Sequence, residues 1–224
     1  LRNCDWSSDV CSSDLALRQG LEAAGFVILD AISAGKRTDI AVGSAGDPFW
    51  NAFSVSKEWT ENYDDPIDRY TARQINSLLR ADNGEEAIYP FDKDAPNFVQ
   101  LWPATFPKLA ASRLGPMIHP TYGLWMAARA HIILPQAYFK FEHAAEFAPC
   151  ESCATKPCLS ACPVGAFSAS KPYDHLACAA HLKTNPACFS GGCDARGACP
   201  YGQSWQLPTD QAQYHQSRFR TSFA

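Results

Sequence analysis

Eight cysteines are gathered in the last third of the chain, in two groups that each end on a Cys-Pro pair. The groups are Cys150-x2-Cys153-x4-Cys158-x3-Cys162-Pro163 and Cys178-x9-Cys188-x4-Cys193-x5-Cys199-Pro200. A short loop of this kind can wrap three thiolates around an iron–sulfur cubane, whose fourth thiolate then comes from elsewhere in the chain. Proline after the last cysteine turns the chain away from the cluster. The two groups therefore predict two [4Fe–4S] clusters.

The position of the two Cys-Pro pairs also predicts which thiols share a cluster. In two-cluster ferredoxins the cysteine before proline ligates the cluster of the other group. On that pattern the first cluster takes Cys150, Cys153, Cys158 and Cys199, and the second takes Cys178, Cys188, Cys193 and Cys162. Four residues separate Cys153 from Cys158, where two are usual. Because the pairing crosses, cluster binding would contribute directly to folding.

Zinc and disulfides are the alternatives for so many cysteines. Eight thiolates could hold two tetrahedral zinc ions. No basic segment followed by an apolar segment marks the N-terminal residues for export. We therefore expect a cytoplasmic protein, in which metal or redox sites are commoner than disulfides. The tight Cys-x3-Cys-Pro ending favours iron–sulfur clusters over zinc.

Charge and hydropathy narrow the class of partner. The formal net charge of −4 gives no general attraction to nucleic acid or to an anionic membrane. The longest apolar run, residues 124–134, is interrupted by Arg129 and His131 and is too short to span a bilayer. We expect no membrane or nucleic-acid partner. A redox protein or a small-molecule substrate is expected instead.

The first fifteen residues differ in character from the rest. Residues 1–15 read LRNCDWSSDVCSSDL, a Ser/Asp-rich string without periodicity that resembles translated sequencing-adapter DNA. On that interpretation Cys4 and Cys11 have no biological role, and the natural protein begins upstream of Ala16. A disordered N-terminal tail is the alternative.

Residues 16–140 carry the pattern of an α+β domain. Apolar spacing and start signals predict helices, with Asp47 and Asp65 as N-caps before proline. Short apolar runs predict strands, and a turn at residues 120–123 predicts a hairpin. Pro103 and Pro107 should allow only short helical pieces in residues 98–113. The expected helices are 17–24, 49–59 and 66–80, and the expected strands are 26–29, 39–42, 87–91, 117–119 and 124–134.

Composition changes to Cys, Pro, Gly and Ala after about residue 140. We predict a ferredoxin-like domain over residues 141–210 and a C-terminal tail over residues 211–224, which begins helical and frays.

The segment from Ser112 to Pro200 resembles the C-terminal half of epoxyqueuosine reductase, a cobalamin-dependent iron–sulfur reductase. The order of the cysteines matches, including the isolated Cys178. The residues that match the stretch before the clusters are Leu114-Gly115, His119-Pro120, Tyr122-Gly123 and Trp125, and Asp94-Ala95-Pro96 is similar to a motif upstream.

More of the chain resembles uncharacterised bacterial proteins that are usually called ferredoxins. They share Asp65-Pro66-Ile67-Asp68-Arg69, Pro90-Phe91 and the cysteine groups. The upstream domain is similar to the cobalamin-processing domain of epoxyqueuosine reductase and of vitamin B12 trafficking proteins. The resemblance implies a nitroreductase-like module that holds cobalamin or flavin. The motif around the catalytic acid of epoxyqueuosine reductase is not found, so its tRNA reaction is not expected here.

Two residues are weak candidates for catalysis. His119 lies in the predicted hairpin turn and could line a cofactor pocket, although a turn histidine bonded to backbone is commoner. Asp94 could act as a general acid, although a loop or cap carboxylate is the default. The predicted function is single-electron transfer through two [4Fe–4S] clusters. The alternatives are a cobalamin- or flavin-dependent reductase and a structural zinc protein.

Overall fold

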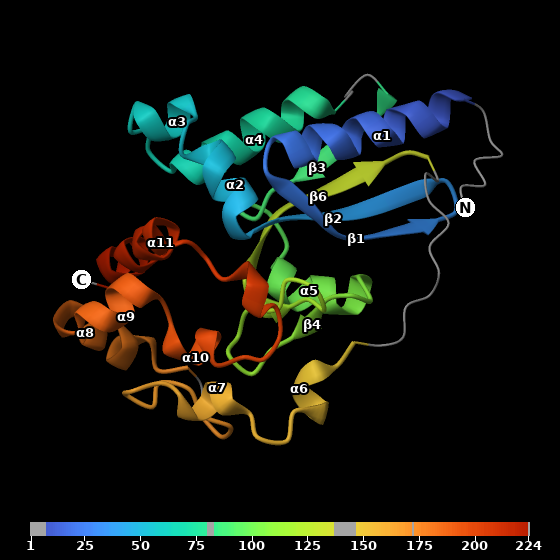
Figure 1. Ribbon diagram of the computed structural model, residues 1–224. Coiled ribbons are helices and arrows are strands. Elements are labelled where there is room, and N and C mark those ends of the chain that lie inside the picture. The colour runs from blue at the N-terminus through green and yellow to red at the C-terminus, as the bar shows by residue number, and fades with distance from the viewer. Residues whose placement is uncertain (1–7, 80–82, 137–146, 172, 224) are drawn as a thin grey trace. The chain divides into compact units, whose positions relative to one another are not determined.

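The computed structural model describes residues 8–79, 83–136, 147–171 and 173–223 (Figure 1). The chain folds into two compact units. The first comprises Leu1–Lys108 with Ala127–Ala145, and the second comprises Leu109–Met126 with Glu146–Ala224. The chain therefore passes into the second unit, returns to the first for one strand, and leaves it again.

A four-stranded sheet forms the centre of the first unit, in the order β1-β2-β6-β3. The strands are β1 (Phe26–Ala34), β2 (Arg37–Ala45), β3 (Glu86–Ile88) and β6 (Met126–Leu134). β1 and β2 are antiparallel, from Phe26 opposite Ser44 to Ala34 opposite Arg37. Gly35, at a φ of +60°, makes the tight turn between them. β3 is antiparallel to β6, with Ala87 opposite Ile132.

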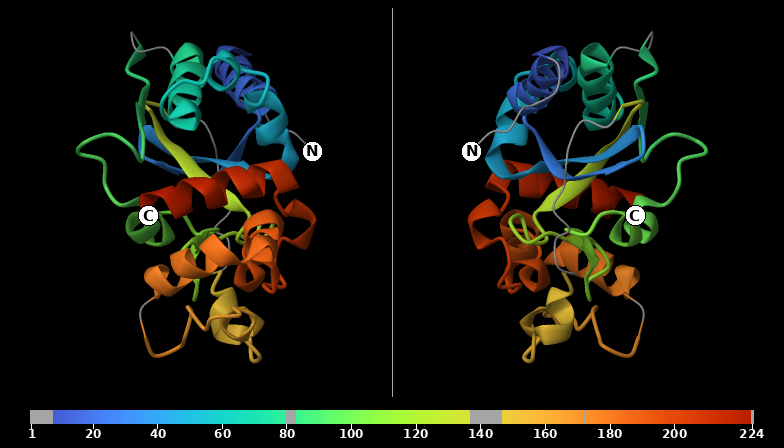
Figure 2. Two further views of the ribbon diagram at one scale, coloured as in Figure 1. Left: turned by 90° about the vertical axis from the view of Figure 1, so that its left-hand side faces the viewer. Right: turned by 90° about the vertical axis from the view of Figure 1, so that its right-hand side faces the viewer.

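Helices cover one face of this sheet with an aromatic core. Helix α1 (Ser8–Ala23) and helix α4 (Pro66–Leu78) lie side by side there (Figures 1 and 2), and α2 (Gly46–Phe53) and α3 (Lys57–Thr60) follow β2. The rings of Phe26, Phe49, Phe53 and Tyr70 are buried and in mutual contact. The Tyr70 hydroxyl donates to the carbonyl of Ala24 at 2.9 Å, which fixes the end of α1.

A buried histidine lies on β6 beneath helix α5 (Phe98–Thr105). The rings of Trp102 and Phe106 pack edge-on against His131. His131 Nε2 is 2.7 Å from an oxygen of Asp39, and Arg37 bonds the same carboxylate at 2.6 Å. The carboxylate thus gives the buried imidazole a hydrogen-bond partner where water is excluded.

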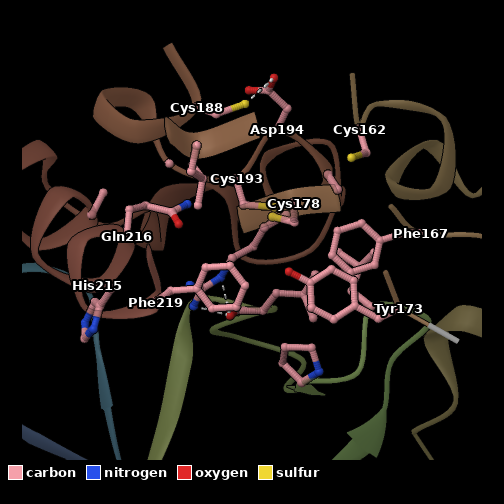
Figure 3. A pocket seen from close by; sticks show the side chains of 18 of the residues that line it. Cys162, Phe167, Tyr173, Cys178, Cys188, Cys193, Asp194, His215, Gln216 and Phe219 are labelled. Atoms are coloured by element: carbon pink, nitrogen blue, oxygen red, sulfur yellow. Dashed lines mark hydrogen bonds between the residues drawn. The ribbon is translucent and has the colours of Figure 1, made fainter. Parts of the chain in front are cut away.

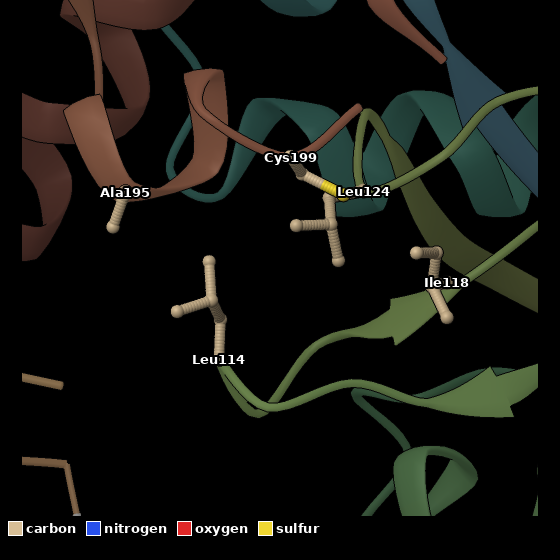
Figure 4. Packing of buried hydrophobic residues seen from close by; sticks show 5 residues of the cluster. All are labelled: Leu114, Ile118, Leu124, Ala195 and Cys199. Atoms are coloured by element: carbon tan, nitrogen blue, oxygen red, sulfur yellow. The ribbon is translucent and has the colours of Figure 1, made fainter. Parts of the chain in front are cut away.

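The second unit is built from short helices and one small sheet. Its core contains Leu114, Ile118, Leu124, Ala195 and Cys199 (Figure 4). Strands β4 (Ala110–Ala111) and β5 (Met117–Ile118) are antiparallel. The helical pieces are α6 (Pro149–Ser152), α7 (Pro157–Ser160), α8 (His175–Thr184), α9 (Pro186–Gly191), α10 (Asp194–Gly197), the 3-10 turn η2 (Gln203–Trp205) and α11 (Thr209–Ser222).

Helix α11 belongs to the second unit, although a tail was predicted for residues 211–224. It lies against α8 and α9 (Figure 2), and the Arg220 guanidinium sits 4.6 Å from the centre of the Phe189 ring. The segment 109–126, assigned to the first domain from the sequence, also lies in the second unit. The predicted boundary at residue 140 lies outside the described residues.

The mixed α+β class is confirmed, and several element boundaries differ from those predicted. Strands β1 and β2 extend beyond the apolar runs that predicted them. The expected helix 49–59 is two helices, and α2 begins at Gly46, with Ala45 and not Asp47 at its N-cap. Gly46 has a φ of +55°, so the chain can turn straight from β2 into the helix.

The predicted hairpin of residues 117–134 is wrong as a pair of strands. Its turn is present, because His119 and Gly123 exchange backbone hydrogen bonds of 3.0 and 2.8 Å. However, β5 pairs with β4, whereas β6 is a central strand of the larger sheet. β6 lies between β2 and β3, and Arg129 and His131 interrupt its otherwise apolar residues.

The N-terminal string is helical from Ser8 onward, where the sequence predicted a helix only from residue 17. Adding turns to an existing helix costs far less than nucleating one. Cys4 lies outside the described residues. None of the described helices is long and apolar enough to cross a membrane.

Candidate functional site

The eight cysteines of the two groups line two separate cavities in the second unit, four to each. Those of the first cavity are Cys150, Cys153, Cys158 and Cys199. Those of the second cavity are Cys162, Cys178, Cys188 and Cys193 (Figure 3). All eight are free thiols. The cavities thus divide the cysteines into the crossed sets that the Cys-Pro pairs predicted.

Two short helices present the first set. Cys150 lies in α6 and Cys158 lies in α7, and each helix begins with a proline at its first position. Between them Lys156 adopts a left-handed φ of 41° and donates its ammonium to the carbonyl of Cys153 at 2.8 Å. The extra residues of the Cys153–Cys158 loop therefore form a closed turn.

The turn before β6 supports the chain that carries Cys199. A Cβ on Gly123, whose φ is +55°, would lie 2.0 Å from the carbonyl oxygen of Tyr201. A Cβ on Gly202 would meet the backbone of Tyr122 at 2.4 Å. Only glycine allows the two backbones to approach so closely. The turn at Tyr122 and Gly123 thus packs against the backbone of Tyr201 and Gly202, just after Cys199.

Side-chain caps fix the helices of the second set. The Asp174 carboxylate accepts from the backbone of Ala177 at the start of α8, which carries Cys178. Asn185 accepts from Ala187 at the start of α9, which carries Cys188. These caps satisfy helix N–H groups that have no partner within the helix.

Backbone N–H groups point at several sulfurs. The Ala166 N–H donates to Cys162 Sγ at 3.4 Å. The N–H groups of Ala195 and Arg196 bond to the Cys193 sulfur, and that of Tyr201 bonds to the Cys199 sulfur. Each of these bonds favours a negatively charged sulfur. Both cavities therefore contain donors suited to thiolates.

Burial and the nearness of other acidic groups oppose the ionisation of two of these thiols. Burial, followed by the neighbouring thiols Cys199, Cys150 and Cys153, raises the pKa of Cys158. Burial and the Asp194 carboxylate raise the pKa of Cys188 to about 11. Four thiolates in one cavity require a positive centre, and binding one releases protons.

The spacing of the thiols does not suit a single ion. Among the described residues, no group of three or more His, Cys, Asp or Glu side chains is close enough to hold one metal ion. Tetrahedral zinc would require sulfurs about 3.8 Å apart, from bonds of about 2.3 Å. A cubane holds its thiolates further apart, because four irons lie between them.

The two cavities differ in volume. The second has a volume of about 490 Å³. The first is about 20 Å³, little more than the space of one water. The second cavity has the four thiols, the backbone donors and the volume that a cubane would need. The residues of the first cavity match in type and donors, but their loop must move outward to hold one.

Four further polar side chains line the second cavity, and of these only Trp125 was named from the sequence. The guanidinium of Arg196 donates to the Leu124 carbonyl at 2.8 and 2.5 Å and lies 4.6 Å from the centre of the Trp125 ring. Tyr173 hydrogen bonds with the Cys178 thiol. Trp125 Nε1 and His181 Nε2 are buried without a hydrogen-bond partner among the described residues. His181 is one helical turn after Cys178, the one signal in the sequence that could have singled it out.

The two weak catalytic candidates lie elsewhere. His119 is buried, and its Nδ1 accepts from the backbone N–H groups of Thr121 and Tyr122 at 3.1 and 3.3 Å. This is the backbone-bonded turn histidine that was the alternative to a functional role. Asp94 is exposed in a turn of the first unit. Neither residue lines a cysteine cavity.

Comparisons with known proteins leave the family open. No family model matches the chain, and no curated protein matches it. Among solved structures, the chain is similar to a B12-trafficking protein CblC from C. elegans, described as a homologue of human MMACHC. The TM-score is 0.49 at 15% identity, over 96% of this chain and 97% of that one. The resemblance to epoxyqueuosine reductase stays a prediction from the sequence.

Proposed function

We propose that the second unit binds two [4Fe–4S] clusters and serves in single-electron transfer. The observation that carries the proposal is the division of the eight thiols between two cavities, four in each. Each cavity takes three cysteines of one group and the Cys-Pro cysteine of the other. A cubane has four irons, each with one thiolate ligand, so four is the number required.

Protein groups around each set of four thiols would adjust the reduction potential of the cluster that it binds. Backbone donors such as the Ala166 N–H at Cys162 and the Tyr201 N–H at Cys199 would stabilise the negative charge on sulfur. Hydrogen bonds to sulfur and exposure to solvent set the potentials of such clusters. When bound, each cluster supplies a one-electron redox couple. The chain holds it in place and limits the access of water.

Iron and sulfide analysis tests this proposal most directly. Anaerobic reconstitution should give about eight irons per chain and a broad absorbance near ~400 nm that dithionite bleaches. The reduced protein should give two interacting paramagnetic signals. A colourless product with one zinc per cysteine group would contradict the proposal and favour the structural zinc alternative, which the spacing of the thiols disfavours.

Whether the protein is an enzyme or a carrier depends on the first unit. Cobalamin or flavin binding there stays a prediction from the sequence resemblance. Titration of the reconstituted protein with hydroxocobalamin, FMN and FAD, followed by absorbance, would test it. Binding of none of them would rule out the reductase alternative and leave a carrier that passes electrons to a partner protein.

A further inference from the structure

A group of apolar side chains is exposed to solvent beside the second cysteine cavity, where α8 begins. Tyr173 is 38% exposed, Leu176 is 63% exposed, and Phe223, just after α11, is 39% exposed. His175 lies between them, because its ring centre is 6.4 Å from that of Tyr173 and 4.8 Å from that of Phe223. We call these four residues the α8 patch. Neighbouring exposed apolar residues of this kind are typical of sites where proteins bind one another.

One side chain of the α8 patch reaches a predicted cluster ligand. Tyr173 hydrogen bonds with the Cys178 thiol, and both residues line the second cavity. The Tyr173 ring is stacked on that of Phe167, with ring centres 4.5 Å apart, which holds it in place. Figure 3 shows these two rings next to Cys178. The path from a ligand sulfur to solvent is therefore one side chain long.

Helix α8 presents an outward stripe opposite the cysteine that it contributes. Cys178 follows Leu176 by two residues, which is about 200° around an α-helix. Leu176 is therefore exposed, while Cys178 lines the cavity. Ala180 and Lys183 are both exposed and lie four and seven residues after Leu176, which is the spacing of one helix face. The stripe thus begins with an apolar side chain and ends with a positive charge.

The residues around the α8 patch are mostly basic, although the whole chain has a net charge of −4. Residues 164–193 and 211–223 form the loop before α8, the helices α8 and α9, and most of α11. These residues include four basic side chains and one acidic side chain, namely Lys171, Lys183, Arg218, Arg220 and Asp174. The Asp174 carboxylate is already engaged as the cap of α8. A partner that complements this surface must carry acidic groups around an apolar centre.

We propose that the α8 patch is the docking surface for an acidic electron-transfer protein. The apolar residues would lie at the centre of the interface and the basic residues at its rim. The electron transfer rests on the proposed function. One electron would pass between the second cluster and the redox centre of the partner, one being oxidised as the other is reduced, and no bond forms or breaks. Interfaces of this class are small, and opposite charges speed their formation.

A plant-type [2Fe–2S] ferredoxin with an acidic surface is the probe. Isothermal titration of the reconstituted, oxidised protein should give one site with a Kd on the order of 10 µM at low salt, because electron-transfer interfaces are small. Leu176→Ser removes apolar surface and should raise the Kd about fivefold. Lys183→Glu reverses a rim charge and should raise the Kd about tenfold at low salt, but much less in about 0.5 M salt.

Val55→Ser and Lys36→Glu are the matched controls. Val55 is 77% exposed and Lys36 is exposed in the turn between β1 and β2, so each variant makes the same kind of change on the first unit. Neither control should change the Kd. Because Leu176 and Lys183 are themselves exposed, their variants should keep the circular dichroism and the iron content of the wild type.

The outcomes separate the docking surface from the clusters. Absence of binding up to about 1 mM by a protein that holds about eight irons would overturn the docking surface and leave the clusters. Equal weakening by the controls, or equally tight binding of the basic protein cytochrome c, would also overturn it. Self-association that Leu176→Ser abolishes, measured by analytical ultracentrifugation without ferredoxin binding, would assign the patch to a second copy of this chain instead. Ferredoxin binding that depends on Leu176 and Lys183 in a protein that takes up no iron would support the docking surface and refute the clusters.

Discussion

Cys199 belongs to the second cysteine group in the sequence, yet its thiol lines the same cavity as that of Cys158. Burial and the neighbouring Cys199 thiol together raise the pKa of Cys158, as expected of groups that face one another. Cys162 from the first group takes the corresponding place in the second cavity. Each cysteine group therefore contributes three thiols to one cavity and one thiol to the other.

Replacing one thiol of each cavity should remove different clusters. Cys199→Ser is expected to damage the cluster of Cys150, Cys153 and Cys158, leaving about four of about eight irons per chain. Cys193→Ser should instead spare that cluster and damage the other. Iron analysis with EPR of the reduced variants distinguishes the remaining signals. Damage of the opposite clusters would show that the pairing is wrong even if both clusters exist.

Gly123 should be as important to the first cluster as a ligand is. Gly123→Ala would place a methyl group 2.0 Å from the Tyr201 oxygen and push the chain after Cys199 away. We expect a loss of about 3 kcal/mol or more, and loss of iron from the first cavity. Urea unfolding and iron retention on dilution would measure both effects.

Gly115→Ala provides the control for Gly123→Ala. Gly115 also has a positive φ, of +100°, but a Cβ there would meet nothing within 4 Å. Its cost should therefore be limited to backbone strain, about 1–2 kcal/mol, with iron content unchanged. Equal effects of the two changes would mean that strain, and not the close approach to Tyr201, explains the requirement for glycine.

The four cysteines that line each cavity are those that the Cys-Pro pairs assign to one cluster, while the clusters themselves stay a prediction. On the ferredoxin pattern, the cysteine before proline serves the other group, and a cubane would require four thiols. The strands 26–29 and 39–42 were similarly evident, since buried strands are continuous apolar runs. Helix α11 was predicted as a fraying tail because its packing partners, α8 and α9, come from another part of the sequence.

Long-range pairing explains what could not be predicted from the sequence. Residues 117–134 look like a hairpin, but β6 finds its neighbours in β2 and β3, and no local pattern identifies a distant partner strand. Arg196 on α10 and His181 on α8 likewise line one cavity, which no local pattern in the sequence indicates.

The stability of the first unit should depend on pH through Glu58. This carboxylate is 2% exposed and bonds Arg73 at 2.5 and 2.8 Å, which lowers its pKa to about 2. Since the pKa is lower folded than unfolded, the pair stabilises the fold fully above about pH 4.5. That contribution is lost as the pH falls from about 4.5 to about 2.

Glu58→Gln should remove this dependence. We expect it to cost roughly 2 kcal/mol at pH 7, reduced from the full linkage value because the Arg73 side chain is 40% exposed. Its unfolding free energy should vary less than that of the wild type between pH 5 and pH 3. Glu22→Gln, an exposed change on α1, should stay within about 0.5 kcal/mol. Parallel pH profiles for the wild type and Glu58→Gln would contradict this account.

Arg196 should raise the reduction potential of the second cluster. Burial lowers its pKa to about 10, so the guanidinium remains charged at neutral pH beside Cys193. Arg196→Met would remove that charge, and reduction, which adds a negative charge, would become harder. We expect the potential to fall on the order of 50 mV, equal to about 1 kcal/mol for one electron. Anaerobic redox titration followed by EPR measures it.

Arg196→Lys separates the charge from the packing. Lysine keeps the positive charge but cannot reproduce the two-nitrogen contact with the Leu124 carbonyl or the stacking on Trp125. If the charge dominates, the potential of the second cluster should fall in Arg196→Met and stay close to that of the wild type in Arg196→Lys. The first cluster should be unchanged in both, because Arg196 does not line its cavity. A similar fall in both variants would instead make the anchoring of Leu124 and Trp125 the role of this residue.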